Sequence, residues 1–280
     1  MPTTSRRQFL TGTAAGFGAL LGLQATPLGM PIGCQSWPVR TQIAKDFVGT
    51  IKDLAADGFQ SVELCSPVGY ATAGFGGLTQ YKGSEIRTML SDQGVNCQSA
   101  HFSMKELWAN QEERIAWAKD AGLTQMLVAS LGGPRQPTMD DVKRAAEEYN
   151  EMGEVAARSG IQQGLHNENF EISTVDGRRT YDALMELLDP ALIKFQFQVS
   201  TISAGYDAAE YFRKYPGRFV SMHVQDWSAE SKQIVAVGQG TLDWQAIFSA
   251  AKVGGIKNYF VEMNPDLMKA SVPYLRKLKV

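Results

Sequence analysis

The three histidines of this 280-residue chain are the first residues that suggest chemistry. His101, His166 and His223 each stand at or near the end of a short, apolar, strand-like segment. Imidazole can transfer protons near neutral pH and is also the commonest metal ligand. A single histidine in such a place is usually a structural residue of a core or rim. Because all three share it, we expect them to be functional.

Carboxylates occupy similar surroundings. Glu63 lies inside one apolar segment and Glu262 ends another. A buried carboxylate is costly unless it is paired, hydrogen-bonded or bound to a metal, so either an ion-paired structural role or a ligand role would account for them. Glu168 follows His166 by two residues, so a continuing strand would point both to the same side. Converging imidazole and carboxylate groups suit a divalent ion such as Mn²⁺, Mg²⁺, Co²⁺ or Zn²⁺.

A recurring unit supplies a fold that could bring these groups together. At five places a helical stretch ends in glycine, an apolar residue follows, and a strand-like run comes next. Glycine after a helix adopts the left-handed conformation that other residues resist. These glycines are Gly58, Gly94, Gly122, Gly160 and Gly255.

Eight strand-like segments fit this spacing. They are Pro31–Trp37, Ser61–Leu64, Cys97–His101, Gln125–Ala129, Gln163–His166, Ile193–Val199, Phe219–Val224 and Tyr259–Glu262. Alternating β and α units predict a parallel sheet, and eight units in about 250 residues predict a single-domain (β/α)8 TIM barrel over residues 31–280. An open, doubly wound sheet is the alternative, but no GxGxxG follows the first strand. Such barrels carry their active sites at the C-terminal ends of the strands, where the histidines fall.

The first 25 residues carry a different signal. Arg6 and Arg7 precede an apolar stretch from Thr11 to Leu23, and no acidic residue occurs before Asp46. This pattern is typical of a twin-arginine (Tat) export signal, with a disordered basic tail as the alternative. It predicts a periplasmic or otherwise exported protein without a stable membrane anchor after cleavage. We assign residues 1–25 to the signal and residues 26–30 to a linker.

Composition excludes other classes of protein. The hydrophobic fraction of 44% and the charged fraction of 20% are ordinary for a globular protein. The formal charge of −2 and the lack of a long basic run argue against nucleic acid binding. Cys34, Cys65 and Cys97 cannot all pair within the chain, and without a CxxC motif a zinc ribbon is not expected. We expect them to be mostly buried and free of structural disulfides.

Several short motifs together resemble the xylose isomerase-like TIM barrel family, also called the sugar phosphate isomerase/epimerase superfamily. They are Gly33–Trp37, Gly58–Leu64, Ser99–His101, Leu165–Glu171, Gly217–His223 with Asp226, Gly238–Gly240 with Asp243–Trp244, and Tyr259–Glu262. The resemblance covers the chain after residue 30. It implies proton transfer at a carbon beside a carbonyl or hydroxyl group, with one divalent metal polarising two sugar oxygens and stabilising an enediolate.

Carried over by position, the resemblance implies metal ligands at His166, Gln198, His223 and Glu262. Gln198 departs from the family pattern, in which this position is usually aspartate. The fifth strand also departs, because Glu168 stands where a second histidine is common. A neutral amide is a weaker ligand for a hard cation than a carboxylate, so we expect the metal to be held less tightly.

The same resemblance implies acid–base work by Glu168, Glu262 or His101, and sugar contacts from Glu63, Trp227 and His166. The predicted function is therefore a metal-dependent isomerase or epimerase, or a keto-sugar lyase, acting on a small-molecule sugar. The sequence leaves open whether the chain forms a homo-oligomer. A non-catalytic sugar-binding barrel is the first alternative, which Gln198 favours. An apurinic endonuclease of the same fold is the second, but the few ligands and the acidic charge argue against it.

Overall fold

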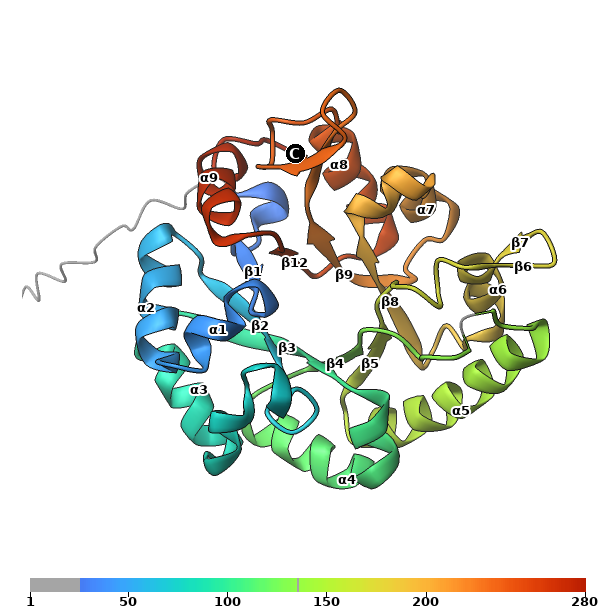
Figure 1. Cartoon of the computed structure of the whole chain (residues 1–280), viewed down its shortest axis with the longest axis horizontal. Helices are drawn as coiled ribbons and strands as arrows, with labels where there is room; N and C mark the ends of the chain where they lie inside the picture. Colours follow the sequence, from blue (N-terminus) through green and yellow to red (C-terminus); the bar gives the residue numbers. More distant parts are fainter. Residues whose placement is uncertain (1–25, 135) are drawn as a thin grey trace, which may run out of the picture.

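The computed structural model describes residues 26–134 and 136–280, so the predicted export signal at residues 1–25 lies outside the described part. Eight parallel strands close into a barrel, which Figure 1 shows along its axis with the helices outside. The order around the barrel is β1-β12-β9-β8-β5-β4-β3-β2. The strands are β1 (Gly33–Gln35), β2 (Ser61–Cys65), β3 (Asn96–Phe102), β4 (Gln125–Val128), β5 (Gln162–Leu165), β8 (Ile193–Gln198), β9 (Phe219–Val224) and β12 (Asn258–Val261). The predicted (β/α)8 barrel is confirmed.

Helices fill the crossovers between these strands. They are α1 (Arg40–Ile43), α2 (Phe47–Asp57), α3 (Gly83–Ser91), α4 (Met104–Asp120), α5 (Met139–Arg158), α6 (Thr180–Leu187), α7 (Ala208–Lys214), α8 (Trp244–Gly254) and α9 (Pro265–Leu275). Short 3-10 helices are η1 (Pro27–Gly29), η2 (Trp37–Val39), η3 (Ala71–Ala73), η4 (Gly76–Gln80) and η5 (Val199–Ala204). Within residues 26–134 and 136–280, none of the helices is long and apolar enough to cross a membrane.

The glycine residues that follow the helices have the predicted left-handed backbone conformation. All five recurring glycines have positive φ angles, between 72° at Gly94 and 106° at Gly58. At Gly58 the backbone N–H caps α2 by donating to the carbonyl groups of Ala55 and Leu54. An L side chain would be strained in this conformation, so glycine allows each helix to stop and turn into the next strand.

Two antiparallel hairpins interrupt the regular alternation and were not predicted. One joins β6 (Thr174–Val175) to β7 (Arg178–Arg179) beside α6. The other joins β10 (Asp226–Ser228) to β11 (Gln233–Val235) in the crossover after β9. The segment assigned as a linker forms η1, where Pro27 is buried and Leu28 packs against the core.

The inside of the barrel is more polar than the layer between barrel and helices. Apolar side chains of α5 such as Val142, Tyr149 and Ala156 are buried against the outside of the sheet. Inside the barrel, by contrast, a network of buried polar groups surrounds one carboxylate, Glu63. Cys34 and Cys65 are buried, Cys97 is half-buried, and all three thiols are free. A polar interior places hydrogen-bonding groups directly beneath the mouth of the barrel.

Candidate active site

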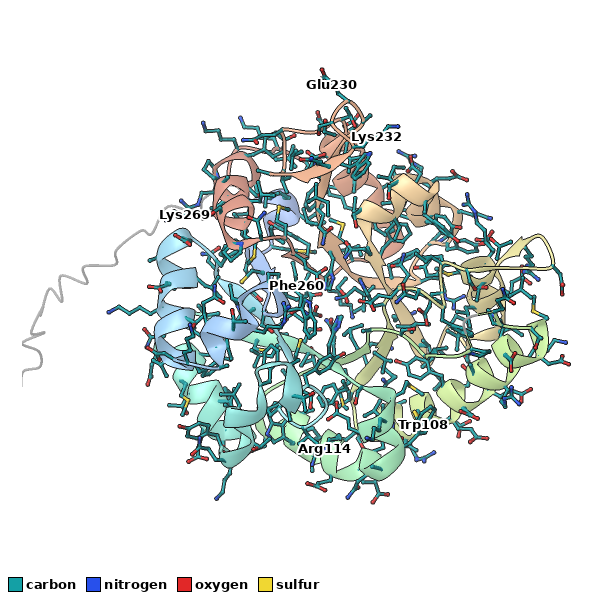
Figure 2. All side chains as sticks on the ribbon, viewed as in Figure 1. Trp108, Arg114, Glu230, Lys232, Phe260 and Lys269 are labelled. Carbon is teal, nitrogen blue, oxygen red and sulfur yellow. The ribbon has the colours of Figure 1, made fainter. Side chains whose placement is uncertain are left out.

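The three histidines meet at the C-terminal mouth of the barrel, as predicted. His101 comes from β3, His166 directly follows β5, and His223 comes from β9. The ring centroids are 4.5 Å apart for His166 and His223, 5.3 Å for His101 and His223, and 5.5 Å for His101 and His166. All three are buried, and one nitrogen of each lies within 4.8 Å of the others. Figure 2 shows how densely side chains fill this centre of the molecule.

Glu63 lies beneath this cluster. Its side chain has no solvent exposure, and its Oε2 is 2.6 Å from Nε2 of His223 and 3.2 Å from Nε2 of His101. Its Oε1 accepts hydrogen bonds from Ser99 Oγ at 2.6 Å and Gln196 Nε2 at 2.8 Å. Burial alone would raise the pKa of Glu63, but the positive charge of the facing imidazoles holds it well below 4.5. Glu63 is therefore an anion that fixes both rings from below.

His223 is held between two carboxylates. Opposite Glu63, its Nδ1 is 3.0 Å from Oε2 of Glu262, the residue that follows β12. Burial opposes protonation, but Glu262 and Glu63 together raise the pKa of His223 to about 10. The same pairing lowers the pKa of Glu262 to about 2 despite its burial. Oε2 of Glu262 also accepts from Gln198 Nε2 at 2.7 Å and Gln225 Nε2 at 3.2 Å.

Two buried polar atoms of the cluster have no hydrogen-bond partner among the described residues. They are Nδ1 of His166 and Oε1 of Gln198. Burial, together with His223 and His101, lowers the pKa of His166 well below 6.5, so its ring is neutral and carries a free lone pair. A buried polar atom without a partner costs about 1–3 kcal/mol. Both atoms are good ligands for a divalent ion, so the donor set fits a metal.

A cavity of about 230 Å³ opens above the cluster. Its lining residues are Gln35, Trp37, Cys65, Tyr70, His101, Ala129, Glu168 and Glu262. Three predicted catalytic residues, Glu168, Glu262 and His101, thus share one cavity. Of the predicted sugar contacts, Glu63 lies below the cavity, and neither His166 nor Trp227 is among its lining residues.

Sequence reasoning missed the aromatic side of this cavity. Trp37 begins η2 just after β1, and Tyr70 precedes η3 after β2. Their rings meet edge to face, with centroids 5.9 Å apart. The Gly33–Trp37 motif already ended on a tryptophan, which is a signal that could have identified it. Nothing in the sequence around Tyr70 distinguishes that residue.

Asp226 anchors the hairpin that carries Trp227. The buried Asp226 carboxylate accepts hydrogen bonds from the backbone N–H groups of Trp227, Gly238 and Gly240 and from the indole N–H of Trp244, at 2.8–3.1 Å. A Cβ atom at Gly240 would lie 2.1 Å from Oδ1 of Asp226. The glycine motif therefore serves close packing around this carboxylate, and Trp227 belongs to β10.

Glu171 fixes the loop that bears Glu168. It is fully buried and accepts from the backbone N–H groups of Leu131 at 2.8 Å and Glu168 at 3.2 Å, and from Ser130 Oγ at 3.1 Å. Burial raises the pKa of Glu171 to about 7. The final glutamate of the fifth-strand motif thus ties the loops after β4 and β5 together.

These observations define a class of protein: a (β/α)8 barrel whose mouth holds a buried imidazole–carboxylate cluster. Comparison of the sequence with protein families gives the particular family. The model of the xylose isomerase-like TIM barrel family matches residues 51–278, and the chain belongs to that family. No curated protein matches the sequence.

Solved structures agree with this fold. A sugar phosphate isomerase/epimerase from Parabacteroides distasonis has 23% identity and a TM-score of 0.73, covering 88% of this chain and 93% of that one. The probable 3-DHS dehydratase AsbF from Bacillus anthracis has 12% identity and a TM-score of 0.68, covering 88% and 98%. The IolI protein, solved with a zinc atom, has 12% identity and a TM-score of 0.65, covering 89% and 94%. At such identities the likeness establishes the fold.

Proposed function

We propose that this protein is a metal-dependent isomerase or epimerase, or a keto-sugar lyase, that acts on a sugar by proton transfer. The observation that carries the proposal is the buried cluster of three imidazoles and Glu262, with two unpartnered ligand atoms, directly beneath a small cavity. Family membership supports it, and so do the isomerase/epimerase and the dehydratase among the similar structures.

Four residues would hold the ion: His166 through Nδ1, Gln198 through Oε1, His223 and Glu262. When bound, a divalent metal polarises two oxygens of the sugar and makes the neighbouring carbon more acidic. The similar structure with zinc supports such an ion, and the mixed nitrogen and oxygen donors suit Zn²⁺, Mn²⁺ or Co²⁺. The hydrogen bond that His223 Nε2 donates to Glu63 would leave the other nitrogen of that ring, Nδ1, to bind the ion.

Proton transfer falls to the acids that line the cavity. Glu168 lines the cavity, and desolvation by the surrounding protein raises the pKa of its carboxyl group. A carboxylate with a raised pKa can both take a proton from a carbon acid and give it back near neutral pH. Glu262 comes from a different strand, so the two carboxylates could serve two faces of a substrate. His101 is the third candidate, although its Nε2 already contacts Gln196 Oε1 at 2.7 Å.

One observation favours a non-catalytic sugar-binding barrel instead. Oε2 of Glu262 already has three partners, namely His223, Gln198 and Gln225. The two amide donors partly neutralise the carboxylate without a metal. A barrel that closes its ligand set in this way could bind a sugar and leave it unchanged.

Calorimetric titration with Mn²⁺ separates the two functions. The proteins to compare are the wild type, Glu262→Gln and Gln198→Asp. The enzyme hypothesis expects measurable binding by the wild type, tighter binding by Gln198→Asp because a charge is restored, and a sharp loss in Glu262→Gln. Deuterium uptake from D₂O into a keto sugar should follow the same order within the metal-binding variants. No binding at millimolar Mn²⁺ by either the wild type or Gln198→Asp would leave the sugar-binding barrel as the better account.

A further inference from the structure

We infer that the cavity takes a neutral, unphosphorylated monosaccharide, which stacks on a wall formed by Trp37 and Tyr70. The inference rests on the proposed function because it concerns the same cavity. It specifies what the family name leaves open, since phosphorylated and unphosphorylated sugars demand opposite charges from a binding site.

The wall is a built feature. Trp37 is 38% exposed although it lines a cavity, and its ring meets Tyr70 at 74°. The fully buried Phe75 supports Tyr70 edge to face, with centroids 6.4 Å apart. Arg40 steadies Trp37, because its guanidinium lies 4.3 Å from the indole centroid and its Nη1 donates to the Trp37 carbonyl at 2.9 Å. A rigid aromatic surface loses little entropy when a ligand lands on it.

The rest of the lining matches a sugar. One face of a pyranose ring presents C–H groups, whose burial against an aromatic face is favourable. Its hydroxyl groups need hydrogen-bond partners, and Gln35, His101, Glu168 and Glu262 offer them around the cavity. The volume of about 230 Å³ is below the range of about 300–1,000 Å³ common for ligand pockets. This space suits one sugar ring rather than an oligosaccharide.

The charges around the cavity disfavour a phosphate. Two carboxylates, Glu168 and Glu262, belong to the lining, whereas none of the described lining residues is lysine or arginine. A phosphate monoester carries a charge of about −1.5 to −2 at pH 7. Arg40 is committed to the ring and carbonyl of Trp37 and is not part of the lining. Glu262 is paired with His223, so Glu168 supplies the uncompensated negative charge of the lining. A sugar phosphate would meet this charge without a lysine or arginine of the lining to bind it, whereas a neutral sugar needs no such partner.

Binding of D-fructose, D-glucose and their 6-phosphates to the full chain tests this inference, by saturation-transfer NMR with and without Mn²⁺. At least one neutral sugar should bind saturably at millimolar concentration, and its phosphate should bind at least about tenfold more weakly. Added NaCl should narrow this gap by screening the repulsion. Trp37→Ala should weaken neutral-sugar binding about five- to tenfold, and Trp37→Phe should largely preserve it. The control is Trp108→Ala, which removes a 57% exposed tryptophan of α4 (Figure 2) that is not among the residues lining this cavity and should change nothing.

Several results would overturn the inference. One is that a sugar phosphate binds as tightly as its neutral sugar or more tightly, and another is that the difference in their affinities does not change with salt. The others are that Trp37→Ala and Trp108→Ala weaken sugar binding equally, and that none of the four sugars binds at tens of millimolar. Failure of the proposed function has a different signature. In that case neutral sugars would bind through Trp37, but no deuterium would enter them and Mn²⁺ would have no effect.

Discussion

Glu63→Gln removes the negative charge beneath two imidazoles and keeps the shape of the side chain. The carboxylate is fully buried and contacts His223 at 2.6 Å and His101 at 3.2 Å. Removing one partner of a buried ion pair costs about 3–5 kcal/mol of unfolding free energy. Because Ser99 and Gln196 can still donate to the remaining amide oxygen, we expect a loss near the lower end of this range in the metal-free protein.

The same substitution should lower the pKa of His223, because an anion that stabilises its protonated form is gone. In the wild type this pKa is raised from 6.5 to about 10. The stabilisation that His223 contributes is therefore fully present below pH 6.5 and is lost as the pH rises through about 10. In Glu63→Gln this alkaline decline should be smaller. Mn²⁺ affinity should also fall, by about ten- to a hundredfold, as is usual when the carboxylate behind a metal-binding histidine is removed.

Urea unfolding at neutral and alkaline pH measures the stability change. NMR of the protein with labelled histidine follows the titration of the three imidazole rings. Replacing each histidine in turn assigns its signals. Glu171→Gln is the matched control for the His223 titration, since Glu171 is equally buried but hydrogen-bonds only to loop groups. The role given to Glu63 would be refuted if the free energy of unfolding of the Glu63→Gln variant lay within about 0.5 kcal/mol of the wild-type value and the pKa of His223 were unchanged.

Three further predictions concern other parts of the chain. Burial raises the pKa of Glu171 from 4.5 to about 7. The wild type should therefore lose about 3 kcal/mol of stability relative to Glu171→Gln as the pH rises through this interval, measurable by urea unfolding; a constant difference would contradict it. Gly240→Ala forces a Cβ against Asp226 and should cost about 1–3 kcal/mol, whereas Gly77→Ala meets no atom within 4 Å and should cost little in thermal unfolding. Replacing both arginines at positions 6 and 7 by lysine should retain the protein in the cytoplasm, and unchanged fractionation would speak against Tat export.

The fold was predictable because the glycine residues that end its helices are a local signal in the sequence. Each recurring glycine marks a helix end that depends only on backbone conformation, so the eight strands follow from the sequence with small errors at their ends. The first strand is shorter than predicted, since the chain turns into η2 at Trp37-Pro38. The β6–β7 hairpin turns at Asp176-Gly177, both with positive φ, which is a recognised hairpin signal. The sequence analysis did not use this signal.

The depth of a side chain inside the barrel was not predictable. Glu63 pairs in register with Gln35 and Ser99, whereas His101 pairs with Cys65, two residues further along β2. Side chains two residues apart on a strand point to the same side but belong to different layers of the barrel. The sequence thus placed a carboxylate within an apolar strand, but it could not show that this side chain is fully buried and contacts His101 and His223 instead of lining the cavity.

The anchoring of the β10–β11 hairpin has a consequence for how this protein could diversify or be engineered. Asp226 holds the base of the hairpin through the backbone N–H groups of Trp227, Gly238 and Gly240, so none of these contacts uses a residue of the tip. Glu230 and Lys232 project outward from its tip (Figure 2), and residues 229–234 are exposed. Folding of the barrel therefore places few constraints on which residues occupy the tip of the hairpin. It is a natural place to graft an epitope, insert a reporter or randomise a library while the barrel retains its architecture.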